Sequence, residues 1–146
     1  MVKLISLNCM KKILLQLIMP FFLITSCAGL KKMEKKLQGN WVLTSVDLQP
    51  IEISQHIPTV KFDTKKKIIS GTDGCNQYQS SFELNSKNKI GIAPLSKTKM
   101  MCIGAMDLAK QFSNYMQSVN SITFNDEGVL ILKTLSNHQL TFKKNN

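Results

Sequence analysis

The stretch that decides the fold is Gly71-Thr72-Asp73-Gly74-Cys75-Asn76-Gln77-Tyr78, and further along the chain reads Thr98-Lys99-Met100-Met101-Cys102. Glycine and asparagine adopt backbone conformations that most residues avoid, so Gly71, Gly74 and Asn76 predict tight turns. Cys75 and Cys102 are the only cysteines outside the N-terminal segment. Within the mature chain, each is therefore the other's only candidate partner.

The N-terminus reads as an export signal. Lys11 and Lys12 precede an apolar run over residues 13–24, which fits a signal-peptide core and is short for a membrane span. The run ends in Leu23-Ile24-Thr25-Ser26-Cys27, which resembles a bacterial lipobox, where the cysteine is acylated and becomes the new N-terminus. We expect lipidation at Cys27; the alternative is an ordinary secretory signal with an incidental cysteine. Met10 is a second candidate start.

Three segments follow from this signal: a lipoprotein signal peptide (1–26), a lipidated tether (27–36) and one domain (37–146). Four lysines lie in the tether: Lys31, Lys32, Lys35 and Lys36. They suit a flexible hydrophilic spacer or, alternatively, a tether lying over a charged membrane surface. Ala28 follows Cys27, where aspartate usually signals inner-membrane retention in enteric bacteria. By analogy we expect the outer membrane, with the domain facing the periplasm.

The charge of the chain bears on its partners. The formal net charge is +10, and all 19 basic residues are lysine. Arginine is the usual side chain for bidentate recognition of phosphates and bases. Its absence argues against a nucleic-acid partner. A basic surface that aids solubility or touches anionic lipid headgroups is the favoured use of this charge.

The hydrophobic pattern predicts an α+β fold. Short β-favouring or alternating runs predict strands near residues 39–46, 60–62, 67–71, 77–84, 89–93, 122–124, 129–132 and 139–142. One helix is expected over about residues 105–119, because its apolar residues recur at helical spacing: Leu108, Phe112, Tyr115, Met116 and Val119. Many strands, one helix and more strands indicate an antiparallel, partly open barrel-like sheet with one packed helix.

The two motifs quoted at the outset resemble the META domain family of HslJ-type bacterial lipoproteins. The resemblance covers roughly residues 37–142 and includes Gly39-Asn40-Trp41, since the family commonly begins with a Gly-x-Trp strand. The matching signature positions are Gly71, Gly74, Cys75, Asn76, Thr98, Met101 and Cys102. The resemblance implies an envelope lipoprotein, whose family has no well-established biochemical activity. Trp41 is expected to pack in the core or at the barrel mouth.

The cysteine pair leaves three alternatives. An export signal implies an oxidising compartment, where paired cysteines are usually bridged. A structural disulfide between Cys75 and Cys102 is the favoured reading. Two free buried thiols are the second, and redox chemistry is the third, although the pair lacks a Cys-x-x-Cys arrangement.

The sequence shows no catalytic motif, and we predict no catalytic residues, metal or cofactor. His56 and His138 lie in different segments with no second ligand at metal spacing. Asp73-Gly74 lacks the oxygen ligands that a calcium loop requires. The Asn76 side chain is expected to close a turn by bonding nearby backbone. The methionines over residues 100–106 are expected to fill gaps in the core, with an apolar binding surface as the alternative.

The resemblance implies a non-catalytic role in envelope maintenance or stress tolerance, with the membrane contacted through the anchor at Cys27. The alternative is a module like the lipoprotein pilots of secretion systems, which bind a lipid chain or a partner peptide in an apolar groove. An envelope protein or a lipid is then the expected ligand. An enzyme is the third class, which two close carboxylates in a cleft would favour.

Overall fold

The computed structural model describes residues 26–52, 56–85 and 87–145. The predicted signal sequence before Ser26, including the second start at Met10, lies outside these residues. Two helices are present in the described part: α2 (Ser26–Leu37) and α3 (Met106–Ser118). The strands are β1 (Gly39–Val46), β2 (Gln49–Pro50), β3 (Thr59–Asp63), β4 (Ile68–Thr72), β5 (Gln77–Leu84), β6 (Ile90–Ile92), β7 (Ser96–Lys97), β8 (Val119–Phe124), β9 (Leu130–Thr134) and β10 (Gln139–Lys144).

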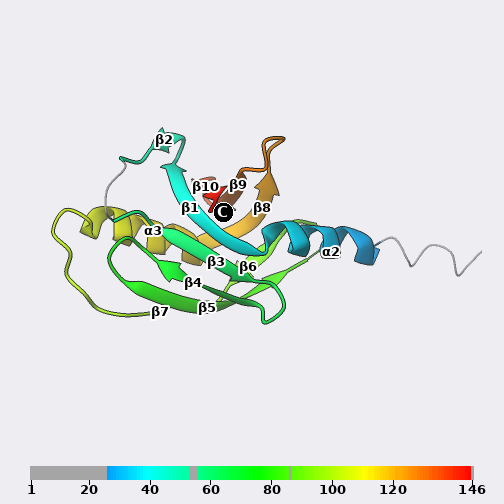
Figure 1. The fold of residues 1–146 in the computed structure, drawn as a ribbon, viewed down its shortest axis with the longest axis horizontal. Helices are drawn as coiled ribbons and strands as arrows, with labels where there is room; N and C mark the ends of the chain where they lie inside the picture. Colours follow the sequence, from blue (N-terminus) through cyan, green and yellow to red (C-terminus); the bar gives the residue numbers. More distant parts are fainter. Residues whose placement is uncertain (1–25, 53–55, 86, 146) are drawn as a thin grey trace, which may run out of the picture.

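The strands form one antiparallel sheet that curls into a nearly closed barrel. The strand order is β6-β5-β4-β3-β1-β10-β9-β8, with β2 paired to β1 and β7 paired to β5 (Figure 1). The two ends of this order, β6 and β8, meet at a seam. A single isolated bridge joins Lys89 to Ser121 there, and Ile122 N donates to Asn88 O at 2.9 Å. The predicted fold class, a partly open antiparallel barrel in an α+β domain, is confirmed.

Alternation along the strands places the core inside the barrel. In β5, Tyr78, Ser80 and Phe82 point inward while their neighbours are exposed, as a half-buried strand requires. In β1, a bulge between Leu43 and Ser45 shifts the register, so that Val46 also faces the core. The largest fully buried side chains come from many elements and include Trp41, Phe62, Phe82, Phe112 and Phe142.

Helix α3 covers this core, as its periodicity predicts. Phe112 and Met116 are fully buried, and the Phe112 ring lies 5.8 Å from Tyr78 and 6.3 Å from Phe142, measured between centroids. Leu108 and Tyr115 are only partly buried. Val119, the last residue of the predicted face, begins β8 instead, because the helix ends at Ser118. The sequence therefore located the centre of the buried face, Phe112 and Met116, and overran the helix by one residue at each end.

Helix α2 corrects the interpretation of residues 27–36 as a flexible spacer. The segment is helical, and its C-terminal end is attached to the barrel. Leu37 is fully buried, and its carbonyl oxygen accepts a hydrogen bond from Trp41 Nε1 at 2.8 Å. Glu34 pairs with Lys67. Lysine, leucine, methionine and glutamate all have high helix propensity. The contacts of Leu37 and Glu34 with the barrel therefore stabilise a segment that already favours helix.

The two helices mark opposite ends of the domain. Figure 1 shows α2 extending from one end of the barrel, while the loop between β7 and α3 lies at the other end. Neither described helix has the length and apolar character needed to cross a membrane. The signature residues lie at the α3 end.

Candidate functional site

The signature begins in the tight turn between β4 and β5. Asp73 N donates to Asn76 O at 2.9 Å, which closes the turn. A Cβ atom at Gly71 would lie 2.2 Å from Thr59 O, so the neighbouring strand leaves no room for a side chain. Gly74 has a φ of +97°, and a Cβ there would lie 2.6 Å from His56 O. Gly71 lies within β4 and not in the predicted turn, whereas Gly74 lies in the turn. Both glycines are required by close backbone approach.

Asp73 is the centre of this site, although the sequence indicated no role for it. Its side chain is fully buried. Oδ1 accepts hydrogen bonds from Cys75 N at 2.9 Å and Asn76 N at 2.6 Å. Oδ2 accepts from Ser113 Oγ on α3 at 3.1 Å and from Lys97 Nζ on β7 at 3.3 Å. One carboxylate thus joins the turn, the edge strand β7 and helix α3.

These donors keep the Asp73 carboxylate charged. Burial raises the pKa of Asp73, but the hydrogen bonds from Asn76 N, Cys75 N, Ser113 and Lys97 outweigh burial and lower the pKa below its ordinary 3.8. Lys97 Nζ also donates to Ser113 Oγ at 3.0 Å, so the three side chains form a closed triangle. A group of this kind is a permanent anion near neutral pH, not a proton carrier.

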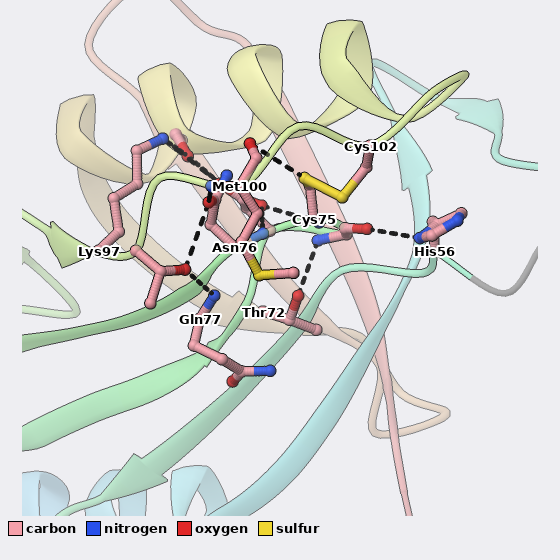
Figure 2. Close-up of a disulfide and its surroundings, with 12 residues drawn as sticks. His56, Thr72, Cys75, Asn76, Gln77, Lys97, Met100 and Cys102 are labelled. Carbon is pink, nitrogen blue, oxygen red and sulfur yellow. Dashed lines mark hydrogen bonds and ion pairs between the residues drawn. A yellow bond between two sulfur atoms is a disulfide. The ribbon is translucent and has the colours of Figure 1, made fainter.

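Asn76 joins the turn to the loop that follows β7. Its Oδ1 accepts hydrogen bonds from Met100 N at 2.7 Å and from Thr98 Oγ1 at 3.3 Å, and Figure 2 shows the amide directed at that loop. The predicted bond to nearby backbone is therefore wrong, because Asp73 already satisfies the local N–H groups. Thr98 Oγ1 also accepts from Gln77 N at 3.2 Å. Signature positions far apart in sequence thus form one hydrogen-bonded unit.

The predicted disulfide is present. Cys75 and Cys102 are bonded across a sequence separation of 27, with their Cα atoms 5.7 Å apart (Figure 2). The bond fastens the loop before α3 to the β4–β5 turn, beside the contacts of Asn76. Closing a loop of this length stabilises the folded state by about 3–4 kcal/mol on the chain-entropy model. The structure thus favours the structural reading of the pair.

The methionines of this loop do not fill the core. Met100 is 57% exposed, Met101 88%, Ile103 98% and Met106 44%. The expectation of core packing is therefore wrong, because the disulfide and Asn76 hold the loop along the outside of the barrel. Scattered exposed apolar residues are ordinary, whereas here four of them lie within seven positions of the chain. We call Met100, Met101, Ile103 and Met106 the loop patch.

A second polar cluster attaches α3 at Tyr115, two residues after Ser113. Tyr115 OH donates to Asp47 Oδ2 at 3.0 Å, and His138 Nδ1 lies 2.9 Å from the same oxygen. The Tyr115 and His138 rings stack, with centroids 4.4 Å apart. Gln139 N donates to Asp47 Oδ1 at 2.8 Å. Burial raises the pKa of Asp47, but the bonds from Gln139, Tyr115 and His138 lower it overall.

A polar hollow of about 680 Å³ lies on the outer face of the sheet beside the signature, between β3, β4, β5 and β7. Lys61, Lys97 and Gln79 line it. Tyr78, also at its edge, donates to Thr59 O at 2.8 Å, and burial near Asp73 raises the pKa of its phenol. Among the described residues, no three histidine, cysteine or carboxylate side chains converge to hold a metal ion. The hollow therefore offers ammonium and amide groups to a polar ligand.

The META domain model matches residues 34–146, which is most of the chain, and the protein belongs to the META domain family. The match includes every signature position and the last turn of α2. None of the curated proteins matches this sequence. The family thus accounts for the fold and for the signature turn, and leaves the activity open.

Solved structures share this architecture. An NMR structure of a protein from Burkholderia xenovorans is 20% identical with a TM-score of 0.63, and the match covers 79% of this chain and 88% of that one. A second NMR structure is 25% identical with a TM-score of 0.61, over 76% and 93% of the two chains. A crystal structure of a DUF4847 family protein from Bacteroides vulgatus is 13% identical with a TM-score of 0.57, over 79% and 99%. These likenesses show the fold.

Sequence reasoning missed Asp73, Lys97 and Ser113 as a unit. The only local signal was Asp73 itself, since an aspartate before glycine often accepts bonds from the next backbone N–H groups. Lys97 and Ser113 lie 24 and 40 positions from Asp73, respectively, and carry no such signal. The Asp47, Tyr115 and His138 cluster was missed for the same reason.

Proposed function

We propose that the protein is a non-catalytic lipoprotein of the META/HslJ type that serves envelope maintenance or stress tolerance. In this proposal acylated Cys27 anchors it to the outer membrane, and the domain faces the periplasm. One observation carries the non-catalytic part: the buried carboxylate of the signature is saturated by four donors of its own chain. A group so engaged holds structure together and has no free acceptor for substrate chemistry.

Two further observations support the proposed location in the periplasm, anchored to the membrane. The Cys75–Cys102 bond is of a kind that persists in oxidising compartments such as the periplasm. Helix α2 begins at Ser26 and ends at the buried Leu37, so it provides a continuous connection from Cys27 to the barrel. A lipid at Cys27 would therefore hold the domain through a short helix fixed to the body.

Fractionation of cells tests the anchor. Cys27→Ala should leave the protein unprocessed or release it from membranes, and it should fail to restore heat and envelope-stress tolerance to a deletion strain. Ser26→Ala is the matched control, because it keeps a small residue beside the cysteine and should behave like wild type. If Cys27→Ala matures and fractionates as wild type does, the lipoprotein proposal is wrong.

The loop patch favours a second candidate function, a module that binds a partner protein. A ligand inside the barrel would have to displace aromatic side chains that are fully buried, such as Phe62 and Phe112. The loop patch instead presents apolar side chains to solvent at the end opposite α2 (Figure 1). The disulfide and Asn76 already fix the backbone of this loop, which reduces the entropy lost on binding.

Crosslinking in intact envelopes tests this candidate. Replacing Met101 and Ile103 with serine should abolish a crosslinked adduct that wild type forms, with no change in melting temperature. Replacing Leu48 and Leu135 with serine is the control, because these two are 73% and 75% exposed and lie outside the loop patch. The loop patch is not the binding surface if the adduct still forms in the Met101 and Ile103 variant. The same holds if the adduct is also lost in the Leu48 and Leu135 control variant.

A further inference from the structure

Helix α2 and the end of β8 enclose a groove of about 310 Å³ near the barrel seam. Met33 and Phe124 give it apolar surface, and Thr123 and Asn88 contribute polar groups. Two lysines of α2, Lys32 and Lys36, also line it. The ammonium group of Lys36 lies 4.4 Å from the centroid of the Phe124 ring, so one wall combines a charge with an aromatic face.

The groove has an uncompensated positive charge. None of the described residues that line it is acidic. Glu34, the acidic residue of α2, is engaged by Lys67 of the β3–β4 hairpin. Lys32 and Lys36 are exposed, and the Lys36 ammonium group lies over the Phe124 ring. Ammonium groups with hydroxyl and amide neighbours bind phosphate oxygens, and the adjoining Met33 and Phe124 surface suits the first carbons of an acyl chain.

The position of the groove indicates where such a ligand comes from. Gly29 lines the groove and lies two residues after Cys27 on the same helix. Two residues of helix rise about 3 Å, so the groove opens beside the attachment point of the anchor. We propose that this groove binds the phosphate headgroup of an anionic phospholipid in the membrane that holds the protein. This proposal rests on the acylation of Cys27 in the proposed function.

A titration of the full-length acylated protein in neutral detergent tests the groove. The probe is dihexanoyl phosphatidylglycerol, with dihexanoyl phosphatidylcholine as the neutral lipid and inorganic phosphate as the free anion. Amide NMR signals of Asn88, Thr123 and Phe124 report occupancy. They should shift with the anionic lipid at concentrations well below those needed for the other two probes. Equal response to inorganic phosphate, or to the neutral lipid, overturns the proposal.

Charge removal locates the site. Each lysine near an anionic lipid surface contributes roughly 5-fold in affinity, so replacing Lys32 and Lys36 with glutamine should weaken binding roughly 25-fold. Replacing Lys65 and Lys66 with glutamine is the matched control, because these two are exposed lysines of the β3–β4 turn and remove the same charge. The control pair should change the affinity less than 3-fold or so. Equal losses in both variants overturn a specific groove.

The two proposals fail separately. Intact mass of the purified protein shows whether Cys27 carries lipid, independently of any titration. An unmodified Cys27 contradicts the anchor, and the groove is then tested on its own by the same NMR titration. An acylated protein whose groove signals do not move contradicts the headgroup site and leaves the anchor standing.

Discussion

Two aspartates attach helix α3 to the sheet, and they do so in different surroundings. Asp73 accepts from Ser113 and is fully buried, whereas the Asp47 side chain accepts from Tyr115 and is 37% exposed. Each has a basic partner, Lys97 for Asp73 and His138 for Asp47. Each also accepts backbone N–H groups. The two clusters thus use similar chemistry at different depths.

The burial of each aspartate decides how much its cluster contributes to the stability of the fold. An unpaired donor or acceptor inside the protein costs its full desolvation, so breaking the Asp73 network leaves buried groups unsatisfied. Water can replace the partners of Asp47, and exposed ion pairs contribute about 0–1 kcal/mol. We therefore expect Asp73 to hold the signature turn in place, and Asp47 to make a small adjustment at the surface.

The largest effect should come from removing the packing on which both clusters depend. Phe112 is fully buried next to Ser113 on α3, so Phe112→Ala should lower the free energy of unfolding by about 3–5 kcal/mol. Urea unfolding of the unacylated domain measures it. Leu135→Ala is the control, since this exposed residue should change stability by less than about 0.5 kcal/mol. Near-wild-type melting with weakened liposome binding would instead make the α3 face a membrane surface.

The disulfide acts on the Asp73 side alone. Replacing both Cys75 and Cys102 with alanine should lower the free energy of unfolding by about 3–4 kcal/mol. A reductant should lower the melting temperature of wild type and leave that of the double variant unchanged. Intact mass after alkylation under denaturing, non-reducing conditions verifies the bond. Two alkylated cysteines in that preparation would show that it is absent.

Asp73→Asn should lower the free energy of unfolding by about 2–3 kcal/mol, because the amide keeps one acceptor but loses the charge that Lys97 and Ser113 face. Urea unfolding near neutral pH measures the loss. Ser113→Ala should show part of the same loss, and the two changes should not be additive, since they act on one network. Full additivity would separate Ser113 from the carboxylate.

The smallest effect should come from the exposed cluster. Asp47→Asn should change the free energy of unfolding by less than about 1 kcal/mol, because solvent screens its pairing with His138. Added salt should reduce the change further. A loss as large as that of Asp73→Asn would mean that depth does not distinguish the two clusters.

Most of the barrel could be predicted from the sequence, because the hydrophobic pattern of each strand reflects which of its faces is buried. The alternation from Gln77 to Leu84 and the helical spacing around Phe112 each reflect one buried face, so they could be recognised without the fold. Helix α2 could not, because its attachment depends on the burial of Leu37 in the core and on the pairing of Glu34 with Lys67, 33 positions along the chain. Its few apolar residues, Leu30, Met33 and Leu37, lie among lysines, so the segment resembles a linker.

The sequence predicted which residues belong to the candidate site, but it did not predict the contacts that those residues make. The turn glycines and the cysteine pair follow from residue type. Asn76 and the exposed methionines were interpreted wrongly, because the loop that Asn76 holds comes from more than twenty residues away. The burial of the Asp73 side chain has no local signal either. Its partners become visible only once β7 and α3 are placed beside the turn.

The pH dependence of stability tests the central claim, that the Asp73 carboxylate is a buried structural anion. Its pKa is lowered in the folded state, so its contribution is present above the unfolded pKa and is lost as the pH falls through the lower folded value. The unfolding free energies of wild type and Asp73→Asn should therefore differ by about 2–3 kcal/mol at pH 7 and converge in strong acid. A difference that does not change between pH 7 and strong acid, or Asp73→Asn as stable as wild type at pH 7, would contradict the claim.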